Sequence, residues 1–121
     1  MARVNPPPPD KVRVLLTDPK PSAAEIDAIG DRFLEADLPS VAAMFYERTK
    51  TPDRAKLVVD RALKDGDAFL LDWASRVLPE AVTADVWRRC AETAERLGKR
   101  SFARSAWVKA GNPEKAAAVK D

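Results

Sequence analysis

The sequence predicts an all-α fold of six or seven short antiparallel helices, stacked as successive hairpins into a superhelix or a compact helical bundle. Apolar residues recur with helical spacing in every strongly patterned segment from Ser22 onward. The linkers between these segments are only a few residues long, which favours antiparallel neighbours. A stretch near the C-terminus also repeats an earlier one sixty-one positions before it, as expected of a helical array.

The repeated stretch joins the end of one helix to the start of the next. Its second copy, residues 102–119, reads FARSAWVKAGNPEKAAAV, and a shift of sixty-one positions places Trp107 on Tyr46. The same shift places the Asn-Pro pair at Asn112 on the Thr-Pro pair at Thr51. Asn and Thr cap helices through a side-chain oxygen, and proline suits the first helical position. Both turns should therefore start a helix, and Tyr46 and Trp107 should occupy equivalent inward positions.

Residues 1–21 are expected to form a proline-rich extended arm ahead of a helical-hairpin domain over residues 22–121. The prolines at positions 6–9 lack backbone N–H groups and have a fixed φ, which argues against helix. Such an arm is either a ligand for an aromatic groove or a stiff spacer, and we favour the spacer. Residues 11–17 alternate like a strand, but no second strand could pair with them. A short helix or an extended segment packed on the domain is expected there.

The helices of the domain are bounded by recognisable caps. Ser22, with Glu25 three positions later, forms a capping box for a first helix that reaches about residue 36. A second helix is expected over about 41–50 and a third over about 52–64, where Gly66 ends it and Asp67 caps the next. The fourth covers about 68–78 and is broken by Pro79.

Three further helices complete the domain. Thr83 caps a fifth helix, whose inward stripe includes Cys90 and Leu97 and which stops at Gly98. A sixth is expected over about 100–110 and a last, alanine-rich one over about 113–120. Aromatic residues at these spacings are expected in the core rather than at a cofactor; they are Phe33, Phe45, Trp73, Trp87, Phe102 and Trp107.

Three phrases, TPDRAKLVVDRAL, LGKRSFARSAW and AGNPEKAAAV, partly resemble tetratricopeptide-like and related α-solenoid repeats. Asp53, Ala55, Ala62 and Leu63 follow the family's order of an acid-rich start, an inward alanine and a later Ala-Leu pair. The Trp, Leu-Gly and Tyr spacing of the family's first helix is absent from most units. The resemblance implies a helical binding scaffold.

Composition restricts the chemistry that this chain can perform. It has 121 residues, a formal net charge of +2, no histidine and one cysteine, Cys90. A zinc site of Cys and His, or a Ser-His or Cys-His nucleophilic pair, cannot be assembled within it. The acids are mixed with Lys and Arg as on solvated helix faces, so no metal or other cofactor is expected. A lone thiol and the lack of a signal or membrane-spanning segment favour the cytoplasm.

We expect a non-catalytic protein–protein interaction module or small scaffold subunit, because stacked hairpins expose a binding surface and no catalytic pair stands out. The expected partner is another protein or peptide, or a larger assembly into which the chain docks, and not a membrane. The alternative is a nucleic-acid-binding helical domain that uses the basic C-terminal part. Acids such as Glu92 lie among those basic residues and no known motif is present, so nucleic acid is less favoured. The candidate partner-binding residues are Arg88, Arg89, Arg96, Lys99, Arg100 and Arg104.

Overall fold

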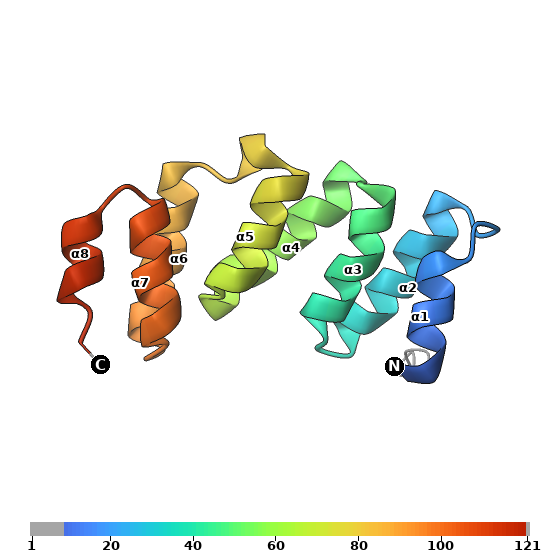
Figure 1. The fold of residues 1–121 in the computed structure, drawn as a ribbon, viewed down its shortest axis with the longest axis horizontal. Helices are drawn as coiled ribbons and strands as arrows, with labels where there is room; N and C mark the ends of the chain where they lie inside the picture. Colours follow the sequence, from blue (N-terminus) through green and yellow to red (C-terminus); the bar gives the residue numbers. More distant parts are fainter. Residues whose placement is uncertain (1–8, 121) are drawn as a thin grey trace. The chain divides into compact units, whose positions relative to one another are not determined.

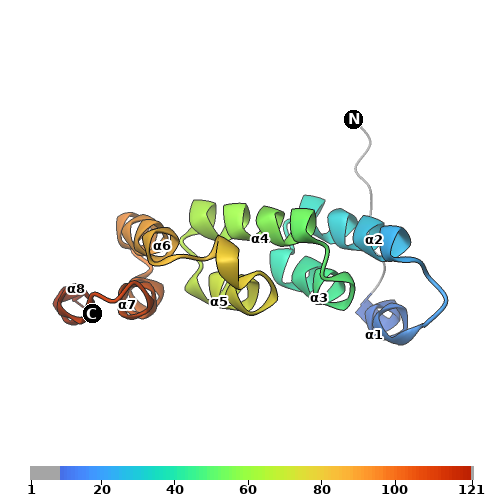
Figure 2. The same ribbon diagram turned by 90° about the horizontal axis from the view of Figure 1, so that it is seen from above.

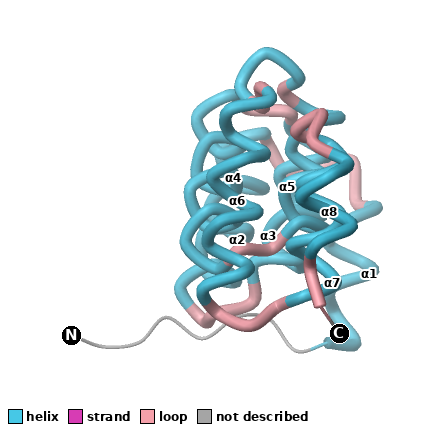
Figure 3. The backbone as a smooth tube through the Cα atoms, turned by 90° about the vertical axis from the view of Figure 1, so that its left-hand side faces the viewer, coloured by secondary structure: helices cyan, strands magenta, loops and turns pink. Residues whose placement is uncertain are grey.

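The structure is a computed structural model that describes residues 9–120. Within these residues the chain is all-helical and contains no strand, as the sequence predicts. Figure 1 labels the helices and Figure 3 shows the loops that join them. The helices are α1 (Pro9–Thr17), α2 (Ala23–Glu35), α3 (Pro39–Thr49), α4 (Pro52–Asp65), α5 (Ala68–Val77), the short 3₁₀ helix η1 (Pro79–Ala81), α6 (Ala84–Arg96), α7 (Arg100–Lys109) and α8 (Pro113–Ala118).

Polar side chains cap the N-termini of four helices. Ser22 accepts a hydrogen bond from the backbone N–H three residues later at 3.2 Å, and Thr83 does the same at 3.3 Å. Asp67 caps α5 at 3.0 Å and Asn112 caps α8 at 3.1 Å. Each bond satisfies an N–H group that the first helical turn leaves without a partner. The side-chain caps predicted at these four positions are confirmed.

The same left-handed turn ends α2, α4 and α6, and it recurs after α7 at Gly111, where the N–H of Asn112 bonds to the Trp107 carbonyl at 2.9 Å. Asp37, Gly66 and Gly98, which follow α2, α4 and α6, have φ angles of 65°, 62° and 73°. In each turn the N–H of the next residue bonds to the carbonyl five positions before it, at 2.9, 2.9 and 2.8 Å respectively. This pattern satisfies carbonyl groups that the helix end leaves without a partner. Three successive helix pairs, α2–α3, α4–α5 and α6–α7, are therefore joined in one way.

The structural repeat extends over more of the chain than the two stretches that match in sequence. Ser22, Thr51, Thr83 and Asn112 immediately precede α2, α4, α6 and α8, and they lie 29, 32 and 29 positions apart. The shift of sixty-one positions therefore maps all of α2 onto α6 as well as the turn that follows each. Helices α2 and α6 have few residue types in common at the matched positions, so the similarity between them lies in the caps and turns.

Contacts divide the chain into two compact units, residues 1–55 and 56–121, and α4 contributes to both. In the first unit α3 packs against α1 and α2, and Figure 2 shows α2 beside α3. The rings of Phe33 and Phe45 stack with their centroids 5.4 Å apart. Tyr46 lies so close to Gly30 that a Cβ there would come within 2.5 Å of the ring. Glycine at this position thus makes room for the tyrosine in the α2–α3 interface.

The N-terminal segment differs from the predicted extended arm, because residues 9–17 form the helix α1. Proline is compatible with the first helical position, where its missing N–H would have no helical partner. The guanidinium of Arg48 on α3 donates to the carbonyls of Leu15 at 2.8 Å and Leu16 at 3.2 Å, and also to that of Asp18. Of the two structures expected for residues 11–17, a short helix or an extended segment, the helix is therefore the one observed. The prolines at positions 6–8 lie outside the described residues.

In the second unit α7 packs against α5, α6 and α8, and Figure 2 shows α7 next to both α6 and α8. Four alanines on α6 and α7 are fully buried, which allows these helices to approach closely; they are Ala91, Ala94, Ala103 and Ala106. Trp107 is buried as Tyr46 is in the first unit, so both predicted inward positions are confirmed.

Two predicted core positions in the second unit are wrong. Leu97 is 48% exposed because it is the C-cap residue of α6, where the chain has already begun to leave the helix. Phe102 is only half-buried, since it lies at the open edge of α7 rather than against α6. The other predicted core aromatics, Phe33, Phe45, Trp73 and Trp87, are buried.

Gly66 and Gly98 provide a matched test of how tightly the second unit is packed. Both have positive φ, so alanine at either position should cost about 1–2 kcal/mol from the backbone conformation alone. A Cβ on Gly66 would also lie 2.7 Å from backbone atoms of Ala94, whereas a Cβ on Gly98 would meet nothing within 4 Å. We expect Gly66→Ala to lower the free energy of unfolding by about 1–3 kcal/mol more than Gly98→Ala, measured by urea denaturation. Equal losses would show that α6 does not approach Gly66 this closely.

Candidate functional site

The structure distributes the predicted basic residues over several surfaces. Arg88, Arg89 and Arg96 lie on α6, Lys99 precedes α7, and the remaining two residues lie on α7 itself. Arg88 is engaged by two acids of its own helix, Asp85 at 2.6 Å and Glu92 at 2.7 Å. Its ion pair with Asp85 holds the pKa of that carboxyl below its usual range. Arg88 is therefore already neutralised by its neighbours.

Two other predicted residues make contacts that stabilise turns. Lys99 donates from Nζ to the Asp65 carbonyl at 2.6 Å, and Arg104 donates to the Val119 carbonyl at 3.5 Å. Within residues 9–120, Arg89, Arg96 and Arg100 are exposed and form no ion pair. Of the six predicted residues, Lys99 and Arg100 are neighbours at the start of α7 and line the same hollow.

A hollow in the second unit lies between α5 and α7. It has a volume of about 310 Å³ and includes Trp87 of α6 in its lining. We call it the Phe69 groove; its residues are Ala68, Phe69, Asp72, Trp87, Ser101, Phe102, Ser105 and Lys109. A hollow of this size is at the small end of the range for ligand pockets.

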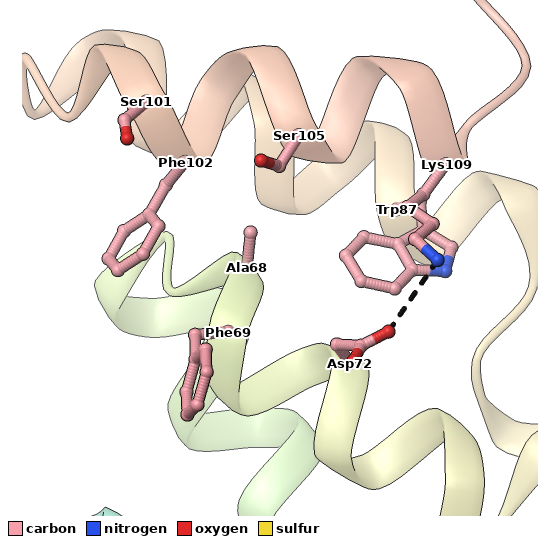
Figure 4. A pocket seen from close by; sticks show the side chains of 8 residues that line it. All are labelled: Ala68, Phe69, Asp72, Trp87, Ser101, Phe102, Ser105 and Lys109. Carbon is pink, nitrogen blue, oxygen red and sulfur yellow. Dashed lines mark ion pairs between the residues drawn. The ribbon is translucent and has the colours of Figure 1, made fainter.

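The Phe69 groove has an aromatic end and a charged end. Figure 4 shows the side chains of Phe69 and Phe102 at one end, and Asp72 with Lys109 at the other. Phe69 is 73% exposed, while the side chains of Ala68 and Trp87 are buried. Lys109 Nζ lies 3.6 Å from an Asp72 carboxylate oxygen. The groove therefore offers apolar surface to water beside a defined ion pair.

A second hollow continues from the aromatic end. It has a volume of about 280 Å³, shares Ser101 and Phe102 with the groove, and is otherwise lined by Lys99 and Arg100. Two of the predicted basic residues are thus adjacent to the aromatic surface. This juxtaposition joins positive charge to exposed apolar area.

Neither Phe69 nor Phe102 is among the site residues predicted from the sequence. Phe69 precedes Leu70 and Leu71, which are both buried, so its apolar character merges with the core pattern of α5. A signal was present, since apolar residues occupy four consecutive positions from Ala68 and a helix cannot turn all of them toward one core.

The first unit contains a buried polar network that begins at Asp27. This residue is only 6% exposed, and its carboxylate accepts hydrogen bonds from Thr49 Oγ1 at 2.7 Å and Thr51 Oγ1 at 2.8 Å. The Thr51 hydroxyl donates to α2, and among the described contacts it caps no N–H of α4. The side-chain cap predicted at Thr51 is therefore wrong; the N–H groups of Arg54 and Ala55 bond to the Thr51 carbonyl instead.

Asp31 extends the network one turn further along α2. It accepts from the Tyr46 hydroxyl at 2.7 Å and from Arg54, whose Nε and Nη2 donate at 3.0 and 2.8 Å. Burial and the adjacent Asp31 raise the pKa of the Tyr46 hydroxyl, which therefore stays protonated as a donor. The hydrogen bond with Asp31 likewise raises the pKa of Arg54. Both carboxylates are satisfied from within the chain, which is the arrangement of a structural clamp.

The remaining reactive side chain, Cys90, is buried in the second unit. Burial raises the pKa of its thiol to about 11, so the nucleophilic thiolate is disfavoured at neutral pH. Within residues 9–120 no three His, Cys, Asp or Glu side chains are grouped so that they could hold a metal ion. In the same part of the chain, no helix combines the length and the apolar character needed to span a membrane.

We expect Asp27→Ala to lower the free energy of unfolding by about 1–3 kcal/mol, because two hydroxyl groups would lose their acceptor in a buried place. The matched control is Asp60→Ala, since Asp60 is exposed in the middle of α4. That change should shift stability by no more than about 0.5 kcal/mol in the same urea titration. A neutral result for Asp27→Ala would mean that the network contributes nothing to folding.

Comparisons with known proteins add no family to this description. No protein-family model, curated protein or solved structure matches the chain. Evidence for the function of this chain therefore comes from the contacts of its own residues, chiefly those of the Phe69 groove.

Proposed function

We propose that this chain is a non-catalytic protein-binding module that engages another protein or peptide through the Phe69 groove. The observation that carries the proposal is the 73% exposure of Phe69 beside half-buried Phe102, on the wall of a hollow between two helices. Aromatic side chains that are both exposed and clustered at a concavity are typical anchors of protein interfaces. The clamped carboxylates and the buried thiol offer no competing chemistry in the described residues.

The proposal includes a scaffold of antiparallel hairpins related to tetratricopeptide-like repeats. Its support is the recurring left-handed turn after α2, α4 and α6 and the spacing of 29 and 32 positions between helix starts. This spacing is shorter than the usual length of about 34 residues for a tetratricopeptide repeat. A generalised α-solenoid, in which neighbouring hairpins expose a continuous binding surface, accounts for both features.

Affinity purification from the source cells, with quantitative mass spectrometry, tests this function. Proteins that bind the groove should be depleted about tenfold or more when Phe69→Ala replaces the wild type, because the main apolar anchor is removed. Met44→Ala is the matched control, since Met44 is a 48% exposed apolar residue on α3 of the first unit. If every retained protein binds the Phe69 variant as well as the wild type, the groove is not the interaction site.

Nucleic-acid binding is the second candidate, favoured only by the exposed and unpaired state of Arg89, Arg96 and Arg100. We expect no shift of DNA or RNA at micromolar protein and low salt, since the formal net charge of the chain is only +2 and Arg88 is already paired with two acids. Changing Arg96, Arg100 and Arg104 together to Glu provides the charge-reversal comparison. A shift by the wild type that weakens steeply with salt, and that disappears in the folded triple variant, would establish the nucleic-acid alternative.

A further inference from the structure

We propose that the Phe69 groove selects an acidic amphipathic segment of its partner. A large apolar side chain would lie between Phe69 and Phe102, and a carboxylate of the same segment would pair with Lys99 and Arg100. This inference rests on the proposed function and specifies the chemistry of the partner. It joins the apolar and the basic surfaces into one recognition site.

The charges around the groove favour an acidic ligand. Among the residues that line it and the adjoining hollow, Lys99, Arg100 and Lys109 are positive and only Asp72 is negative. Asp72 is itself close to two cations, Lys109 at 3.6 Å and Arg76 at 3.8 Å. The single acid is therefore compensated, and the positive charge at the start of α7 is not.

The start of α7 strengthens this positive field. Lys99 and Arg100 lie at the N-terminal end of the helix, where the helix dipole places a partial positive charge. No acidic residue occupies the first turn of α7, in contrast to α6, where Asp85 does. A carboxylate brought by a partner would supply the negative charge that the sequence of α7 omits.

The apolar surface determines what must accompany that carboxylate. The 310 Å³ groove can accommodate one or two large apolar side chains, and the rings of Phe69 and Phe102 border its open end. Arg100 and Phe102 line the same hollow, so the ligand must present its acid and its apolar anchor close together. An amphipathic helix does this with residues three or four positions apart. Phosphate chains are less suited, because the Asp72 carboxylate lines the same groove.

The test is a selection from random sixteen-residue peptides displayed on phage, with the full chain as bait. Peptides retained by the wild type should be enriched at least about tenfold over those retained by Phe69→Ala, since the anchor site would be absent. The enriched peptides should carry net negative charge and two large apolar residues three or four positions apart. Met44→Ala should retain the same peptides as the wild type, which controls for the loss of an exposed apolar residue.

Charge reversal then tests the basic half of the site. Arg100→Glu should weaken a synthetic copy of the best selected peptide about tenfold in fluorescence anisotropy, whereas Arg89→Glu on α6 should leave its affinity within about twofold. Circular dichroism of each variant shows whether the helices persist. Because both arginines are exposed and form no ion pair in the described residues, neither change removes a structural contact.

The outcomes separate this inference from the proposed function. Enrichment of neutral or basic peptides that depends on Phe69 would overturn the acidic preference while the groove remains a peptide site. A lack of any Phe69-dependent peptide would overturn the inference, and together with no Phe69-dependent protein in the purification it would overturn the function as well. Displacement of the selected peptide by oligouridine would overturn the inference in favour of nucleic acid.

Discussion

The left-handed turn at the end of each first helix is the constraint on which both units depend. At Asp37, Gly66 and Gly98 the chain leaves one helix and begins the next within three residues. In each case the fourth residue of the next helix is buried. The residues at these places, Ala42, Leu71 and Ala103, are all fully buried. One backbone conformation thus recurs ahead of a buried position, which is alanine in two of the pairs and leucine in the third.

Equivalent positions in the two units are stabilised by different chemistry. In the first unit Tyr46 donates to Asp31, which also receives Arg54. In the second, Trp107 takes the place of Tyr46 and donates from Nε1 to Glu95 at 3.1 Å, and Lys115 takes the place of Arg54. Lys115 lies 4.6 Å from the Trp107 ring centroid, as in a cation–π contact. Both units thus combine an inward aromatic residue with a cation on the next helix, although the hydrogen bonds of the two units differ.

The local features of the fold were predictable because they depend on neighbouring residues. Caps such as Ser22, and the glycine turn at Gly66, follow from side-chain and backbone geometry over a few positions. Features that depend on distant contacts were not. Helix α1 is completed by Arg48, more than thirty positions away, and the Thr51 hydroxyl is directed to Asp27 rather than to its own helix. The same limit applies to the site, since Phe69 and Phe102 become neighbours only through the packing of α5 on α7.

The position of the Phe69 groove coincides with a break in the repeating pattern of the second unit. Two residues separate α3 from α4 and three separate α7 from α8, but six residues including η1 separate α5 from α6. Left-handed conformations occur at Lys50, directly after α3, and at Gly111, the second residue after α7, whereas Leu78 directly after α5 has a φ of −136°. Pro79 cannot continue α5, so the chain forms η1 before α6 begins. Among the described helices of this unit, the connection that contains η1 is thus the longest, and it directly follows α5. Phe69 of α5 and Phe102 of α7 line the groove between these two helices, so the aromatic surface lies on the helix that precedes this connection and on α7.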